Sequence, residues 1–135
     1  MDIIPKALLT GAAFGAADFL YNGVLRKDHN NNFFATINGS KPGVYQEKYP
    51  MLFGLIIWLL IGFGIQKFVV PLSSSALSAL LNGALFGFIL YGVYDLTNKA
   101  LVKNWTYSFS FQDIAWGTAL TALVSAAAYG FQRLQ

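Results

Sequence analysis

Long apolar runs separated by short polar connections dominate the chain. Stretches without a charged residue cover 49–66, 68–94 and 114–132. Each of them approaches or exceeds the roughly 20 residues that cross a bilayer as an α-helix. Inside the second run, Pro71 and the serine triplet 73–75 are a turn signal. We therefore predict that one crossing ends near Val70 and that the next begins near Ala76.

A further crossing is predicted near the N-terminus, where residues 3–25 are apolar apart from Lys6, Asp18 and Asn22. The small residues just before Asp18 also fit the end of a signal-peptide core. Asp2 beside a single lysine makes the start only weakly basic, which favours an uncleaved transmembrane helix. The predicted fold is an all-α membrane protein, a compact four-helix transmembrane bundle with short loops. It forms one domain over 1–135, with helices at 3–25, 50–70, 76–100 and 112–133 and one longer polar loop at 26–49.

Basic residues near the helix ends predict the orientation of the bundle. The two loops on one side contain Arg26, Lys27, Lys41, Lys48, Lys99 and Lys103, and the other side contains Lys6, Lys67 and Arg133. This bias places the two loops on the cytoplasmic face or its equivalent. Both termini then lie together on the opposite face.

Composition agrees with a membrane protein and argues against several functions. The chain is 56% hydrophobic and 11% charged, whereas about 25% of residues are charged in soluble domains. It has no cysteine, and His29 is its one histidine, which argues against zinc, haem and a Ser-His-Asp triad. We therefore expect no enzyme activity, catalytic residue, metal site or cofactor. The net charge of +3 gives no reason to expect nucleic acid, and the expected partners are the lipid bilayer and protein subunits or a second copy of the chain.

The polar loop combines three asparagines with Phe33 and Phe34, followed by turn signals at Asn38-Gly39 and Pro42-Gly43. This pattern is compatible with a small hairpin or with aromatic residues lying on the lipid headgroups. A plain connection and a recognition element both remain open.

Helix packing is expected to depend on small residues, because lipid removes the hydrophobic force that drives helices together in water. Two GxxxG pairs and one further glycine are the predicted contact points: Gly11, Gly15, Gly83, Gly87 and Gly117.

Three acids, Asp18, Asp95 and Asp113, fall toward the same end of the predicted bundle. Such groups are rare inside membranes unless they are paired or functional. Asp95 is one helical turn before Lys99, a spacing that allows an ion pair. Ser110 and Asp113 match the start of a capping box for the last helix. We predict one polar cluster of these acids with neighbouring polar side chains, namely Asn22, Asn82, Tyr91, Asn98, Trp116 and Thr118.

The run ALFGFILYGVYDLTNKALVKNW and the following FQDIAWGTALTAL resemble the small integral membrane proteins of the domain-of-unknown-function family numbered 2177. These proteins occur in bacteria and in large DNA viruses. The first helix is similar to the family's Asp-x-x-Trp-Leu-Gly segment, with Tyr21 in place of the tryptophan, and 28–48 departs most. The resemblance supports the four-helix fold and brings no biochemical activity. It implies recurring positions at Asp18, Gly83, Gly87, Tyr94, Asp95, Leu96, Thr97, Asn98, Asp113, Trp116, Gly117 and Thr118.

Two functions of different class follow from these observations. The first is a non-catalytic structural or anchoring membrane protein, such as a component that links a viral capsid to its internal membrane. The second is a small proton- or cation-coupled transporter that uses Asp18 and Asp95. We expect it to act as a dimer, because four short helices enclose little volume. Buried acids favour the transporter, whereas a glycine-packed interior without a broken helix opposes it. The sequence does not distinguish a virion membrane from a cell membrane.

Overall fold

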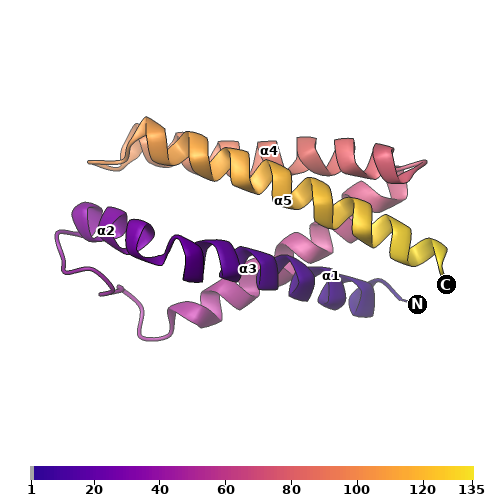
Figure 1. Cartoon of the computed structure of the whole chain (residues 1–135), viewed down its shortest axis with the longest axis horizontal. Coiled ribbons are helices and arrows are strands. Elements are labelled where there is room, and N and C mark those ends of the chain that lie inside the picture. Colours follow the sequence, from indigo (N-terminus) through magenta and orange to yellow (C-terminus); the bar gives the residue numbers. More distant parts are fainter. Residues whose placement is uncertain (1) are drawn as a thin grey trace.

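The computed structural model describes residues 2–135, which form helices and turns and contain no strand. Four helical segments are long and apolar enough to cross a membrane: Ile3–Leu25, Pro50–Leu72, Ala76–Leu101 and Tyr107–Arg133. Both termini lie at one end of the molecule and α2 (Lys27–Asn38) lies at the other (Figure 1). The all-helical, four-span fold predicted from the apolar runs is confirmed.

Two of the four segments change their winding along their length. The first begins as α1 (Ile3–Asp18) and continues as the π-helical stretch η1 (Phe19–Leu25). The second begins as α3 (Pro50–Gly64), continues as π-helical η2 (Ile65–Val69) and ends in the 3-10 turn η3 (Val70–Leu72). A π-helical turn inserts an extra residue and is frequent at functional sites. Both stretches begin beside a partly or fully buried polar side chain, Asp18 in the first case and Gln66 in the second.

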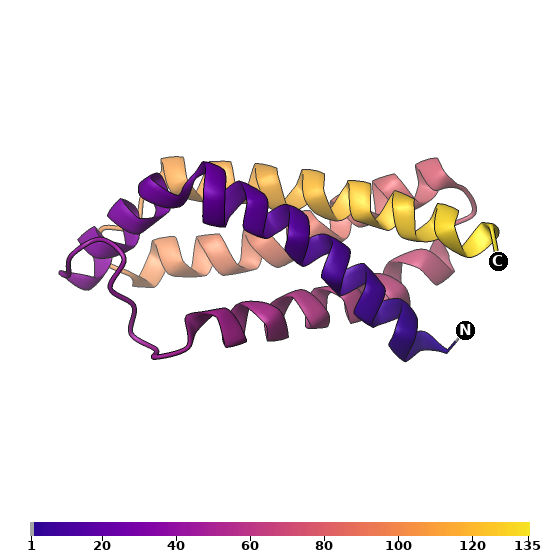
Figure 2. The same cartoon turned by 60° about the horizontal axis from the view of Figure 1, so that its bottom comes forward.

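The other two segments are the long helices α4 (Ala76–Leu101) and α5 (Tyr107–Arg133), which run antiparallel and side by side (Figures 1 and 2). The last helix begins five residues earlier than the predicted 112. Its N-cap is Thr106, whose hydroxyl accepts the backbone N–H of Phe109 at 3.1 Å. The predicted cap at Ser110 is therefore wrong. Ser110 lies inside the helix and is buried, where its hydroxyl accepts the indole N–H of Trp105 at 3.0 Å.

Residues 27–38 form the helix α2, so the hairpin, one of the two alternatives for the polar loop, is wrong. Gly39 ends α2 in the left-handed conformation, with φ of 63°, and the N–H of Ser40 returns to the carbonyl of Ala35. Phe33 stacks on Phe109 with ring centroids 3.8 Å apart. The aromatic residues of this segment thus pack on the end of α5, and α2 covers the polar end of the bundle.

Glycines mark the closest approaches between helices. A Cβ added to Gly11 would lie 2.8 Å from the carbonyl oxygen of Trp58, and one on Gly62 would meet the backbone of Gly11, so α1 and α3 touch there. A Cβ on Gly87 would lie 2.7 Å from the carbonyl of Gly117 on α5. Gly15 and Gly117 instead meet side chains, those of Trp58 and Tyr91, and Gly83 lies against Ser125 and the carbonyl of Thr121. Backbones this close leave no room for a channel between α4 and α5.

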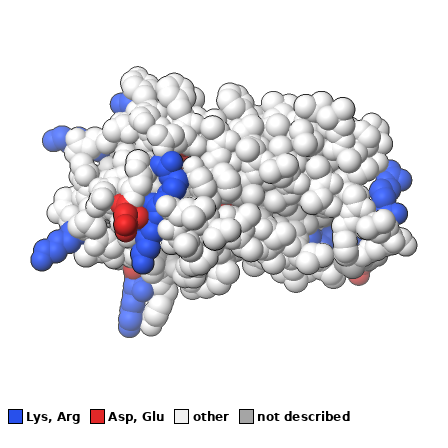
Figure 3. Space-filling view, in the orientation of Figure 1, with Lys and Arg blue, Asp and Glu red and all other residues white. Residues whose placement is uncertain are grey.

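A hydrophobic core joins the two helix pairs. It is built around Phe14, Ile65, Val69, Ala79 and Leu120, which come from four different segments. Charged side chains gather at the two ends of the molecule, and an uncharged band separates them on the face shown in Figure 3. The band has the appearance expected of a membrane-spanning surface.

Single-cysteine labelling provides a direct test of the topology, since the natural chain contains no cysteine. We expect Lys41→Cys and Lys103→Cys to react with a membrane-impermeant maleimide from the same side. Ser74→Cys, in the connection between η3 and α4, is the control and should react from the opposite side. Labelling of positions 41 and 103 from opposite faces would contradict the four-span arrangement.

Candidate functional site

Asp18 is the centre of a hydrogen-bonded network at the end of the bundle nearer α2. Its Oδ2 accepts the indole N–H of Trp58 on α3 at 2.9 Å. Its Oδ1 accepts the indole N–H of Trp116 on α5 at 2.9 Å and the amide of Asn22 on η1 at 2.8 Å. One carboxylate thus connects three of the four membrane segments.

The network extends from Asp18 to the helix outside the membrane spans. The amide of Asn30 on α2 donates to the side-chain oxygen of Asn22 at 3.1 Å and to its carbonyl at 3.2 Å. The ring of Tyr21 stacks on Trp116, with centroids 3.9 Å apart. The π-helical stretch η1 therefore contributes two neighbouring residues to the network: Tyr21 packs on Trp116, and Asn22 links Asp18 to Asn30.

Asp95 and Asp113 form a second group of acids, between α4 and α5. Asp95 is 0% exposed, and neither of its carboxyl oxygens receives a hydrogen bond from another polar group of the described residues. The carboxyl of Asp113 on α5 lies near enough to interact electrostatically with it. Two carboxylates at close range repel each other, so a proton on either one would relieve the repulsion.

The predicted ion pair between Asp95 and Lys99 is not formed. The ammonium of Lys99 lies over the ring of Tyr107, 4.6 Å from its centroid, while Asp95 points toward α5. Spacing along one helix permitted the pair, and the packing of α4 against α5 turned the acid away from it.

A small cleft leads from the α2 end toward Asp113. It is lined by Tyr21, Asn22, Arg26 and Gln112 among others, and its volume of about 10 Å³ is close to that of one water site. Arg26 lies near enough for its charge to act on Asp113. Its guanidinium donates to Gln112 at 2.5 Å and to the hydroxyl of Tyr21 at 3.4 Å. Arg26 thus covers the route between the acids and the membrane surface.

The remaining residues predicted for the cluster lie in different places. Tyr91 packs on Gly117 within the electrostatic range of all three acids. Asn98 contacts Tyr94, and the buried hydroxyl of Thr118 has no hydrogen-bond partner in the described chain. Asn82 was wrongly assigned, since its amide donates to Ser73 at 3.1 Å at the opposite end of the bundle. Asn82 is 13 residues before Asp95 on one straight helix, a distance of about 20 Å.

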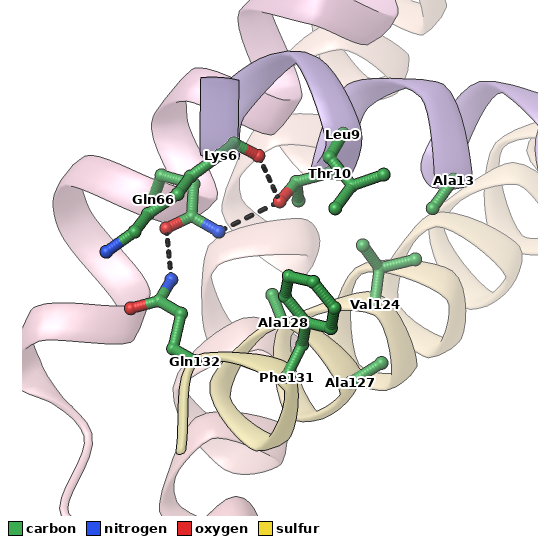
Figure 4. Close-up of a pocket in the computed structure, with 10 residues that line it drawn as sticks. All are labelled: Lys6, Leu9, Thr10, Ala13, Gln66, Val124, Ala127, Ala128, Phe131 and Gln132. Carbon is green, nitrogen blue, oxygen red and sulfur yellow. Dashed lines mark hydrogen bonds between the residues drawn. The ribbon is translucent and has the colours of Figure 1, made fainter. Parts of the chain in front are cut away.

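A second polar group, which the sequence did not predict, lies at the terminal end between α1, η2 and α5. The hydroxyl of Thr10 donates to the carbonyl of Lys6 at 2.8 Å and accepts from Gln66 at 2.8 Å. Gln132 donates to the side-chain oxygen of Gln66 at 2.6 Å. Figure 4 shows this chain of amides beside a pocket of about 170 Å³. Gln66, an uncharged polar residue at the end of the charge-free run 49–66, was the available signal.

The arrangement limits the chemistry that these residues perform. Within residues 2–135, no three His, Cys, Asp or Glu side chains are grouped so that they could hold a metal ion. Asp18 accepts hydrogen bonds from three N–H donors. Asp95 and Asp113 lie near each other between α4 and α5. Trp58 was missed as a member of the site, because its partner is 40 residues away in the chain.

Comparison with known proteins identifies the family to which the chain belongs but no individual curated protein or solved structure. No curated protein matched the chain, and no solved structure matched it. The family described as "Predicted membrane protein (DUF2177)" matches residues 3–130. That range contains three membrane segments, most of the fourth, and both acid groups. The chain belongs to this family of membrane proteins.

Proposed function

We propose that the protein is a non-catalytic structural or anchoring component of a membrane. The observation that supports this proposal best is the engagement of Asp18 by Trp58 and Trp116. A carboxylate that accepts from two other helices holds them in register, because a shift of α3 or α5 relative to α1 would break its bond to Trp58 or to Trp116.

The interior of the bundle supports the same reading. Gly62 on Gly11 and Gly87 on Gly117 bring backbones into contact, and the core residues Phe14 and Ile65 are 0% exposed. A transporter needs a binding site with alternating access, usually at a broken helix near the bilayer midplane. The acids lie instead toward one end, beneath α2.

The partner of such an anchor would meet the polar end of the molecule. This end carries α2 and the connection that follows it, with exposed Lys27, Asp28, His29 and Lys41. We propose that this surface contacts other subunits of a larger assembly. A link between a capsid and an internal membrane is the specific form that the resemblance to viral members favours.

A proton-coupled carrier is the second candidate, and the Asp95–Asp113 pair is the observation that favours it. This pair has no cationic partner on Asp95 and lies beside a cleft that opens toward the surface. A site that must hold a proton is a necessary part of a proton carrier.

Liposomes loaded with a pH-sensitive dye separate the two functions. We expect the reconstituted wild-type protein to give no proton flux above that of protein-free liposomes under an imposed pH gradient. The variants Asp18→Asn and Asp95→Asn should lower abundance or assembly and leave this background unchanged. Wild-type flux that disappears in a folded Asp95→Asn protein would replace the structural function with transport. Asp28→Asn, an exposed change on α2, is the matched control.

A further inference from the structure

Two adjoining hollows between the first two membrane segments form one continuous surface depression, which we call the α1–α3 groove. Its apolar part has a volume of about 530 Å³ and is lined by small and aliphatic residues, including Gly15, Ala16 and Leu55. Its polar part has a volume of about 430 Å³ and includes Lys27 and Asn31. The two parts share Phe19, Met51 and Trp58. Each volume is in the range of small-molecule binding sites, about 300–1,000 Å³.

The depth of the groove matches one leaflet of a bilayer. Its inner end is the crossing of α1 and α3 at Gly11 and Gly62, where the two backbones touch. From this crossing the helices separate toward the α2 end (Figure 2). Gly11 is seven residues from Asp18, or about 10 Å along the helix, and half of the hydrocarbon core is about 15 Å. The apolar part therefore lies within the leaflet adjoining α2.

The polar mouth of the groove favours an anionic group. Its one cationic side chain is Lys27, which is exposed. The hydroxyl of Tyr45 donates to Oδ1 of Asn31 at 2.9 Å, which leaves the amide N–H groups of Asn31 available as donors. Asp18 also lines the mouth, but three N–H donors already bind its two oxygens. An ammonium and an amide beside a hydrocarbon slot suit a phosphate that carries acyl chains.

We propose that the α1–α3 groove binds one glycerophospholipid of the leaflet on the α2 side. Lys27 and Asn31 hold its phosphate, and one acyl chain lies along Ala16 and Leu55 as far as the Gly11–Gly62 crossing. The lipid fills the space where α1 and α3 separate, and its glycerol region lies beside Trp58 and hence beside the Asp18 network. This binding site does not depend on the structural function proposed above.

Native mass spectrometry of the full chain in detergent, titrated with palmitoyl-oleoyl phosphatidylglycerol, tests the site. We expect the wild type to bind one lipid with saturation. Ala16→Phe fills the apolar part from an exposed position and should weaken binding about tenfold, because several methylenes lose their contacts. Lys27→Gln should weaken it about fivefold, the effect of one lysine near a phosphate. The matched controls are Ala119→Phe on α5 and Lys103→Gln, both exposed and outside the groove, and they should bind as the wild type does.

Three results would overturn the proposal. Binding that never saturates, or that Ala16→Phe leaves unchanged, would show that lipid does not occupy the groove. If Lys27→Gln and Lys103→Gln have equal effects, the phosphate is not held at Lys27. If the spectra show a dimer that Ala16→Phe dissociates while lipid binding is unaffected, the occupant is a second copy of the chain. Circular dichroism of each variant verifies that it is folded before its binding is compared.

Discussion

Replacing Gly62 by alanine is expected to lower the free energy of unfolding by about 3 kcal/mol, near the upper end for overpacking a tight contact. The added methyl group would meet the N and Cα of Gly11 and the carbonyl oxygen of Ala7, at 2.6 Å for two of these atoms. All three are backbone atoms that cannot rotate away, so α1 and α3 must separate. Reversible unfolding in mixed micelles, followed by circular dichroism, measures the change.

Gly92 supplies the matched control, because a Cβ at that position meets nothing within 4 Å. Gly92→Ala on α4 should be neutral or should stabilise the helix by about 0.5–1 kcal/mol, the gain in helix propensity over glycine. Equal effects at positions 62 and 92 would mean that the α1–α3 contact does not determine stability.

Replacing Asp18 by asparagine is expected to lower the free energy of unfolding by about 1–3 kcal/mol. The amide has the same size as the carboxylate but only one acceptor oxygen. In the wild type, three N–H donors are bound by two carboxylate oxygens. At least one of Trp58 and Trp116 would then face an N–H group without a partner. Hydrogen bonds to charged groups contribute about 1.5–3 kcal/mol in water-soluble proteins, and bonds between membrane helices contribute less, about 0.6 on average.

The same unfolding experiment in micelles measures this change, and tryptophan fluorescence reports separately on the indoles. Asp28→Asn, on the exposed face of α2, removes the same charge and should have little effect. If the two variants unfold alike, Asp18 does not organise the bundle, and the structural function loses its main support.

The membrane crossings were predictable because their signal is local. Apolar length and the turn at Pro71 depend on residues that adjoin in the chain, and the predicted spans at 3–25 and 76–100 agree with Ile3–Leu25 and Ala76–Leu101 within one residue. The start of the last helix was misjudged because Thr106 and Ser110 are both able to cap. Trp105 settled the choice, since it needs the buried Ser110 hydroxyl as an acceptor.

The sequence by itself determined that this is a four-span membrane protein and that acids lie toward one end, since hydropathy and position along a helix are properties of the chain alone. Only the tertiary structure decided which polar groups meet. Asp95 faces Asp113 instead of Lys99, and Trp58 reaches Asp18 from another helix. These pairings depend on how each helix is rotated about its axis. That rotation is set by glycine contacts between helices, such as Gly62 on Gly11, which no pattern within one segment contains.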